Sequence, residues 1–152
     1  MDNDIIIRQA LPSDIPRLCS LLEDLFILES DFTPDVEKQT HGISMLVTDP
    51  TGASFVAVAV KGIEVVGMAT VQTLVSTAEG GRVGLIEDVI VRKDLRGKGT
   101  GTRLLHAVVE WSRGMQLKRL QLLADLDNRP ALDFYRNRRW NTTRLICLRK
   151  ML

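Results

Sequence analysis

The residues best suited to chemistry in this sequence form a basic, glycine-rich segment, Arg96-Gly97-Lys98-Gly99-Thr100-Gly101. An apolar stretch precedes it and an amphipathic stretch follows it, so we expect it to join a strand to a helix. Glycines allow positive φ and close backbone approach, and successive N–H groups can then converge on one anion. The helix N-terminus adds partial positive charge, while Arg96 and Lys98 add full charges. The segment therefore suits a phosphate or pyrophosphate, although a glycine-rich turn with no ligand is the simpler alternative.

Two other phosphate-binding motifs do not fit this segment. A Walker A loop needs Ser or Thr after Gly97-Lys98 and a Gly five residues before Gly97, but Gly99 and Arg92 occupy these positions. A dinucleotide fingerprint needs GxGxxG, and Thr102 stands where its last Gly belongs. The acidic ribose ligand expected about 20 residues further on is also absent. The sequence thus argues against both nucleotide-binding folds.

Hydrophobic and polar periodicity predicts alternating strands and helices around this segment. Apolar residues recur at helical spacing after Pro12 and again from Gly99 to Gly114, and short β-branched runs predict strands. The expected strands are Ile5–Ile7, Phe55–Val60, Ile63–Val75, Arg82–Val91, Leu120–Ala124 and Arg144–Leu148. Further helices are expected at Pro34–Leu46 and Pro130–Asn137. The order βααβββαβαβ predicts a mixed sheet with helices packed on it.

Length and composition predict one globular domain over residues 1–152, with 45% hydrophobic and 26% charged residues. The longest stretch without a charge, Val65–Ala78, is too short to span a membrane, and the acidic N-terminus does not resemble a secretory signal. Cys19 and Cys147 form no metal or disulfide pattern, and we expect both in the core of a cytoplasmic protein.

Charge is divided unevenly along the chain. Residues 1–91 hold 5 basic and 14 acidic side chains, whereas residues 92–152 hold 15 basic and 5 acidic ones. This division favours an anionic partner for the C-terminal part and a cationic partner for the N-terminal part. Nucleic acid is a weak candidate, because the chain has one Tyr, four Phe and a pI near neutral.

Two segments resemble the GNAT superfamily of acetyl-CoA-dependent N-acetyltransferases. Arg96–Gly101 matches its R/Q-x-x-G-x-G/A signature, and the lead-in Ile86–Val91 resembles its central strand. Farther on, Asn128–Tyr135 resembles its N-x-x-A-x-x-F/L-Y segment at about the usual spacing. One departure is Arg139, which precedes Trp140 where the family commonly has Gly.

The resemblance implies an α/β (α+β) fold of the GNAT acyl-CoA N-acyltransferase type. Its mostly antiparallel, mixed central sheet would have six to seven strands flanked by about four helices. It also implies that the pyrophosphate of acetyl-CoA rests on the glycine segment, namely Arg96, Gly97, Lys98, Gly99, Thr100 and Gly101. The pantetheine arm would follow the strand backbone at Val89, Ile90 and Val91, much as a peptide adds to a sheet edge.

Tyr135 is the single tyrosine, and the resemblance implies that it lies near the cofactor sulfur and protonates the leaving thiolate. A phenol with a pKa near 10 can donate a proton at neutral pH. The alternative is a packing role beside Phe134. Asn128 would bind the cofactor arm or cap the helix that starts near Pro130.

An acceptor amine is protonated at neutral pH and needs a base, or a pocket that lowers its pKa, before it can attack. Glu87 and Asp88 are the candidates, because they interrupt an apolar strand just before the cofactor stretch. Alternation along the strand places Glu87 on the face of Val89, and a bulge would change that. Neither His41 nor His106 is favoured as the base.

We therefore expect an N-acetyltransferase that moves the acetyl group of acetyl-CoA directly to a primary amine of a small molecule or peptide, without a metal. The alternatives are a non-catalytic acyl-CoA-binding or sensing module and, less favoured, a basic nucleic-acid-binding domain. Six acids between Leu21 and Glu37, with no base among them, favour a cationic acceptor. We expect neither nucleic acid nor membrane as a partner and leave a homodimer open.

Overall fold

The structure is a computed structural model that describes residues 4–29 and 31–152. Contacts divide the chain into two compact units, one that ends at Leu122 and one that runs from Leu123 to Leu152. The first unit contains β1 (Ile5–Gln9), α1 (Ile15–Leu28), α2 (Val36–Val47), β2 (Ser54–Lys61), β3 (Glu64–Ser76), β4 (Gly81–Val91), α3 (Thr100–Gly114) and β5 (Leu120–Leu122). The second contains α4 (Arg129–Arg136). Two single 3-10 turns, Pro12–Asp14 and Lys93–Leu95, precede α1 and follow β4.

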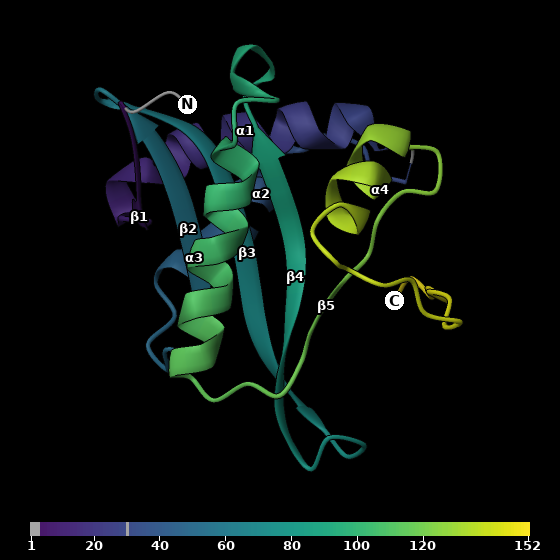
Figure 1. Cartoon of the computed structure of the whole chain (residues 1–152). Helices are drawn as coiled ribbons and strands as arrows, with labels where there is room; N and C mark the ends of the chain where they lie inside the picture. The colour runs from purple at the N-terminus through teal and green to yellow at the C-terminus, as the bar shows by residue number, and fades with distance from the viewer. Residues whose placement is uncertain (1–3, 30) are drawn as a thin grey trace. The chain divides into compact units, whose positions relative to one another are not determined.

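The five strands of the first unit form one mixed sheet in the order β1-β2-β3-β4-β5 (Figure 1). The first four strands are antiparallel neighbours, whereas β5 runs parallel to β4. A parallel partner requires a crossover, and α3 supplies it between β4 and β5. This confirms the predicted mixed, mostly antiparallel sheet with helices on it.

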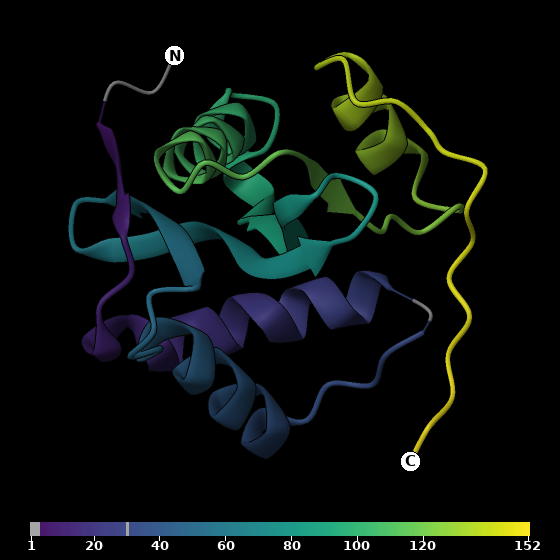
Figure 2. The same ribbon diagram turned by 90° about the horizontal axis from the view of Figure 1, so that it is seen from below.

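Helices cover both faces of this sheet: α1 and α2 lie on one side and α3 on the other (Figure 2). On α1, the apolar residues spaced three and four apart turn inward, and all are 7% exposed or less: Leu18, Leu21, Leu22 and Leu25. They pack against Met68 of β3 and Ile90 of β4 in one core cluster. The sequence pattern of α1 thus becomes the apolar layer that fixes the helix beside the central strands.

One predicted strand is wrong. The sequence favours a strand at Arg144–Leu148, but residues 141–152 contain no strand in the structure. The segment forms no ladder with any described strand, and its apolar side chains Leu145, Ile146 and Leu148 are more than 80% exposed. A β-forming sequence remains irregular when its N–H and C=O groups have no partner strand. The sheet has five strands instead of six or seven, and β5 ends at Leu122 instead of Ala124.

The two cysteines have different environments. Cys19 lies in the buried core of α1, as expected. Cys147 lies in the irregular C-terminal segment and is exposed, so the expectation of a core position for it is wrong. Both are free thiols.

Within the second unit, the turn after α4 explains the unusual Arg139. The Trp140 N–H donates to the Tyr135 carbonyl (3.1 Å) and the Arg139 N–H to the Arg136 carbonyl (3.0 Å), which is the Schellman pattern of a helix C-terminus. The rings of Tyr135 and Trp140 lie 6.0 Å apart and supply its hydrophobic contact. Arg139 occupies the left-handed position of this motif with φ 64°, where glycine is usual. The turn keeps the geometry of the glycine form while carrying a strained arginine.

Replacing Arg139 with glycine should therefore relieve backbone strain. A left-handed residue with a Cβ costs about 1–2 kcal/mol, and the greater freedom of glycine in the unfolded chain offsets about half of this. We expect Arg139→Gly to stabilise α4 by roughly 0.5–1 kcal/mol, measured by hydrogen exchange of the amides of residues 132–140. Arg139→Ala is the control, since it removes the guanidinium but keeps the Cβ. An equal gain in both variants would mean that the arginine side chain, and not its φ, is unfavourable.

Candidate active site

The glycine segment forms an open loop between β4 and α3. Gly97 and Gly99 have φ values of 74° and 88°, which side chains with a Cβ rarely adopt. A Cβ built on either glycine would meet nothing within 4 Å, so the backbone at these positions is accessible to a ligand. Gly99 is also the N-cap of α3 and has no side chain to cap the first N–H groups of that helix. Open space and uncapped N–H groups are what the predicted phosphate or pyrophosphate site needs, and the binding itself stays a prediction.

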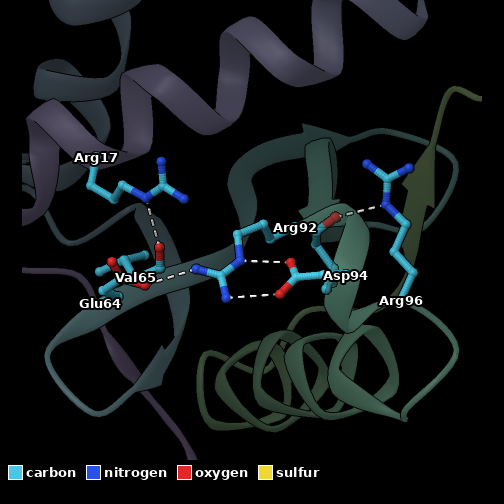
Figure 3. Close-up of polar contacts among 7 residues, drawn as sticks. Arg17, Glu64, Val65, Arg92, Asp94 and Arg96 are labelled. Carbon is cyan, nitrogen blue, oxygen red and sulfur yellow. Dashed lines mark hydrogen bonds and ion pairs between the residues drawn. The ribbon is translucent and has the colours of Figure 1, made fainter.

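Two cations of this loop are exposed, and one of them is anchored to the strand before it. The Arg96 Nε donates to the Val91 carbonyl at 2.8 Å, which holds the guanidinium beside the end of β4 (Figure 3). Lys98 is exposed on the loop, whereas the Thr100 side chain is buried where α3 begins. The two charges and the helix N-terminus give this end of the first unit a positive potential suited to an anion.

The strand that leads to the loop has a partly unpaired edge. On the side away from β3, β4 pairs with β5 only at Gly84–Ile86. In the described part of the first unit, no strand pairs with Val89, Ile90 or Val91 on that side. Main-chain groups of this edge can therefore receive an extended amide chain that continues from the glycine loop. The structure thus brings Val89–Val91 and Arg96–Gly101 together in one unit.

A β-bulge lies at the two acidic residues of β4. In the pairing with β3, Val71 faces Ile86 and Ala69 faces Val89, so Thr70 lies opposite both Glu87 and Asp88. The extra residue changes the alternation from the simple pattern that pairs Glu87 with Val89. Glu87 is exposed and Asp88 is 8% exposed, so the bulge separates two neighbouring carboxylates into a solvated and a buried one.

Thr70 holds the bulge through two hydrogen bonds with the same residue. The Asp88 N–H donates to the Thr70 Oγ1 (3.1 Å), and the Thr70 hydroxyl donates to the Asp88 Oδ2 (3.1 Å). The Thr70 side chain is fully buried. Nothing in the sequence marks Thr70, because a threonine is an ordinary residue of a strand and only the register of β3 against β4 gives it this role.

Burial raises the pKa of the Asp88 carboxyl to about 7, and the negative charges of Glu87 and of Glu29 add to this effect. The hydrogen bond from Thr70 acts in the opposite direction, because it stabilises the carboxylate. A carboxyl with a pKa near 7 exists in both protonation states at neutral pH, which is the property a general base needs.

The six acids that follow Leu21 have different roles. Glu29, directly after α1, is close enough to act on the Asp88 carboxyl, so this part of the chain contributes charge near the bulge. Asp35 instead caps α2, since its carboxylate accepts from the Lys38 N–H at 3.1 Å. The others are exposed: Glu23, Asp24, Asp31 and Glu37.

The remaining predicted site residues belong to the second unit. The Asn128 Oδ1 accepts from the Ala131 N–H at 3.2 Å, so Asn128 caps α4, in line with the capping alternative. Tyr135 lies on α4 with its ring edge-on to Phe134 at 5.2 Å, which is compatible with the packing alternative. In the first unit, His41 and His106 are exposed on helices.

An ion-pair network beside the loop is absent from the sequence-based prediction. Arg92 lies between two carboxylates, those of Asp94 in the following turn and Glu64 at the start of β3 (Figure 3). Arg92 and Asp94 are close in sequence and could have been paired from spacing alone. Glu64 is 28 residues away, and the sheet alone brings it near.

The described residues contain neither a metal-binding cluster nor a helix that could span a membrane. Across residues 4–29 and 31–152, no three His, Cys, Asp or Glu side chains gather in a way that could hold a metal ion. Within the same ranges, no helix is both long and apolar enough to cross a membrane.

The amino-acid sequence matches a family of acetyltransferases. The model of the acetyltransferase (GNAT) family matches residues 15–139. Streptothricin acetyltransferase A of Bacillus subtilis (strain 168) is 45% identical over 51 residues, which are 34% of this chain and only 30% of that enzyme.

Solved structures share the fold at low sequence identity. An aminoglycoside acetyltransferase from an uncultured soil metagenomic sample, solved in complex with trehalose, aligns with a TM-score of 0.79 at 23% identity, over 99% of this chain and 98% of that one. A transcriptional regulator from Bacillus halodurans C-125 aligns with a TM-score of 0.83 at 21% identity, over 97% and 99% of the two chains. At this identity the likeness shows the fold alone.

The raised pKa of Asp88 should make stability depend on pH in a definite direction. The folded chain holds this proton up to pH about 7, whereas the ordinary value is 3.8, so the folded state binds more protons between these limits. The contribution of the protonated carboxyl is fully present below pH 4 and is lost as the pH rises through 7. Guanidinium unfolding should show that Asp88→Asn gains stability over wild type across this range, by on the order of 4 kcal/mol at most.

The exposed neighbour provides the control for this experiment. Glu87→Gln removes a carboxylate from the same bulge without removing a buried one, so its stability difference from wild type should change much less with pH. A difference between Asp88→Asn and wild type that stays constant from pH 4 to pH 8 would show that Asp88 ionises normally.

Proposed function

Because the chain belongs to the GNAT family of acetyltransferases, we propose that it is an acetyl-CoA-dependent N-acetyltransferase that acts on a primary amine of a small molecule or peptide. The observation that carries this proposal is the open glycine loop, Arg96–Gly101, which a single turn joins to a strand with a partly unpaired edge. We propose that residues 1–152 act as one catalytic domain in the cytoplasm, where two free cysteines stay reduced.

Bound acetyl-CoA would supply an acetyl thioester as the acyl donor. In this proposal, the N–H groups of Gly97–Gly101 and the N-terminus of α3 hold its pyrophosphate, and Arg96 and Lys98 neutralise the charge. The edge of Val89–Val91 holds the extended arm through main-chain hydrogen bonds. The chain's own groups thus orient the donor along β4, toward the bulge at Glu87 and Asp88.

The acidic pair at the bulge is our proposed proton acceptor. The pKa of about 7 makes Asp88 the better-matched base, and Glu87 is the exposed group that an approaching ammonium meets first. Removal of a proton from the amine frees the lone pair that attacks the thioester carbonyl. Tyr135 is the proposed acid for the leaving thiolate, an assignment that rests on the family resemblance, and Asn128 is the proposed ligand of the cofactor arm.

Charge around the bulge favours a cationic acceptor. The negative charges of Glu29 and Glu87 both act on Asp88 here, whereas the loop that would hold the anionic cofactor is basic. An amine with further positive charge would be drawn to the acidic residues, and an amine with extra carboxylates would be repelled. Two similar proteins are named as a streptothricin acetyltransferase and an aminoglycoside acetyltransferase, and these names support a cationic acceptor.

The cofactor site can be tested by placing a side chain on the loop. Gly99→Val puts a branched side chain where backbone must approach phosphate, and calorimetry should show at least about tenfold weaker binding of acetyl-CoA. Gly80→Val is the matched control, because Gly80 has a similar φ of 62° and open space but lies at the β3–β4 turn. Unchanged affinity in a folded Gly99→Val protein would reject this site.

The proposed acid can be tested by removing one proton. Tyr135→Phe keeps the ring and should lower kcat by about 10²-fold or more with little change in acetyl-CoA binding. Phe134→Leu serves as the control, since it alters the adjacent packing and removes no proton. If kcat of Tyr135→Phe stays within about threefold of wild type, Tyr135 is a packing residue.

The reaction and its acceptor class can be tested by one thiol-release assay. The panel compares spermidine, 2-phenylethylamine and glutamate as amines of decreasing positive charge, at low and high salt. We expect the largest kcat/KM for spermidine, falling with salt, because exposed charges are screened beyond about 8 Å at physiological ionic strength.

Two variants test which acids set this preference. Glu29→Gln should reduce the preference for spermidine. Glu23→Gln, which changes an exposed residue of α1, should leave it unchanged. No thiol release with any amine would favour a non-catalytic acyl-CoA-binding module, and a preference for glutamate would contradict the cationic acceptor.

A further inference from the structure

We infer that Arg92, together with Asp94 and Glu64, positions the glycine loop for the cofactor, an inference that rests on the proposed function of that loop. None of the three residues belongs to the loop itself. Arg92 follows the last residue of β4, Asp94 lies in the single turn Lys93–Leu95, and Glu64 begins β3. They meet at the only stretch of backbone that connects β4 to the loop.

The Arg92 guanidinium binds both carboxylates at the same time. Its Nε and Nη2 donate to Asp94 Oδ1 and Oδ2 at 2.7 and 3.0 Å, and its Nη1 donates to Glu64 Oε2 at 2.8 Å (Figure 3). The two hydrogen bonds to Asp94 are parallel, so they set the orientation of the turn as well as its distance. These bonds raise the pKa of the guanidinium and lower the pKa of the Asp94 carboxyl, which keeps both groups charged.

Glu64, the second partner of Arg92, belongs to a strand end that other hydrogen bonds hold in place. The Arg92 backbone N–H donates to the Val66 carbonyl at 2.8 Å, two residues after Glu64. Arg17 of α1 donates its Nε to the Val65 carbonyl at 3.0 Å, beside the same glutamate (Figure 3). The network therefore connects the turn before the loop to a strand that is fixed by both the sheet and a helix.

The loop needs such support, because its residues before the buried Thr100 provide little packing. Gly97 and Gly99 have open space where side chains would be, and Arg96 and Lys98 are exposed. On the N-terminal side, the buried Leu95 side chain and the Arg96–Val91 bond hold the turn to its own strand. Arg92 adds a connection to a second strand. Convergent N–H groups bind an anion well only if their directions are fixed beforehand.

Stability alone does not account for this network. Exposed ion pairs typically contribute between 0 and 1 kcal/mol, and the Asp94 and Glu64 side chains are more than 60% exposed. If charge alone mattered, the two carboxylates would weaken cofactor binding, since they lie near the loop and repel an anion. Removal of Asp94 should then strengthen cofactor binding if only charge matters, and weaken it if Asp94 positions the loop.

The decisive variants are Arg92→Lys and Asp94→Ala, measured by calorimetry with coenzyme A as the probe. Arg92→Lys keeps the charge but not the planar fork. We expect both variants to weaken binding about threefold to tenfold, with a rise in KM for acetyl-CoA that exceeds the fall in kcat. In the ligand-free protein, hydrogen exchange of the amides of residues 96–101 should accelerate in both. Arg113→Lys, which changes an exposed, ion-paired arginine of α3, is the matched control and should change neither quantity.

The outcomes separate this inference from the function on which it rests. A wild-type protein that does not bind coenzyme A overturns the proposed function and the inference together. If the wild type binds, Gly99→Val loses affinity and Arg92→Lys does not, then the inference alone is wrong. Tighter binding in Asp94→Ala also overturns it, because that result assigns the network an electrostatic role only.

Discussion

The pairing of β3 with β4 is the constraint on which the candidate site depends. One extra residue in β4 places Thr70 opposite both Glu87 and Asp88, and the two hydrogen bonds between Thr70 and Asp88 hold this bulge inside the sheet. The bulge buries one carboxylate and exposes its neighbour, which gives two adjacent acids different protonation behaviour. Because α1 packs beside these strands, the charge of Glu29 also acts on the buried acid.

The same strand joins two chemically opposite regions. Its middle carries the acids of the bulge, and a short turn after its end leads to the basic loop Arg96–Gly101. The loop begins at Arg96, eight positions after Asp88. An anion on the loop and a cation at the bulge would therefore be held close to one another, at the end of β4 and within it. The boundary between the acidic residues 1–91 and the basic residues 92–152 thus falls at the end of this strand.

Much of this arrangement could be predicted from local patterns. The start of α1 and the bounds of α3 follow from the periodicity of their apolar residues. The loop follows from its glycines, which adopt positive φ values readily. The C-terminal strand is the instructive error: Arg144–Leu148 has the composition of a strand, but a strand exists only with a partner. At Arg139 too, the local residue type misleads: arginine rarely adopts a left-handed conformation, but the turn after α4 requires one at this position.

The sequence by itself determined the order of the elements from β1 to α4, the basic loop at the start of α3 and the pair of acids in β4, because these depend on residues within a few positions of one another. Only the tertiary structure decided which of the two acids is buried, since Thr70 lies 18 residues before Asp88 and meets it through strand register. It also decided that Arg92 pairs with Glu64 across 28 residues. Register and strand pairing are set by the packing of the whole sheet, and no short window of sequence contains them.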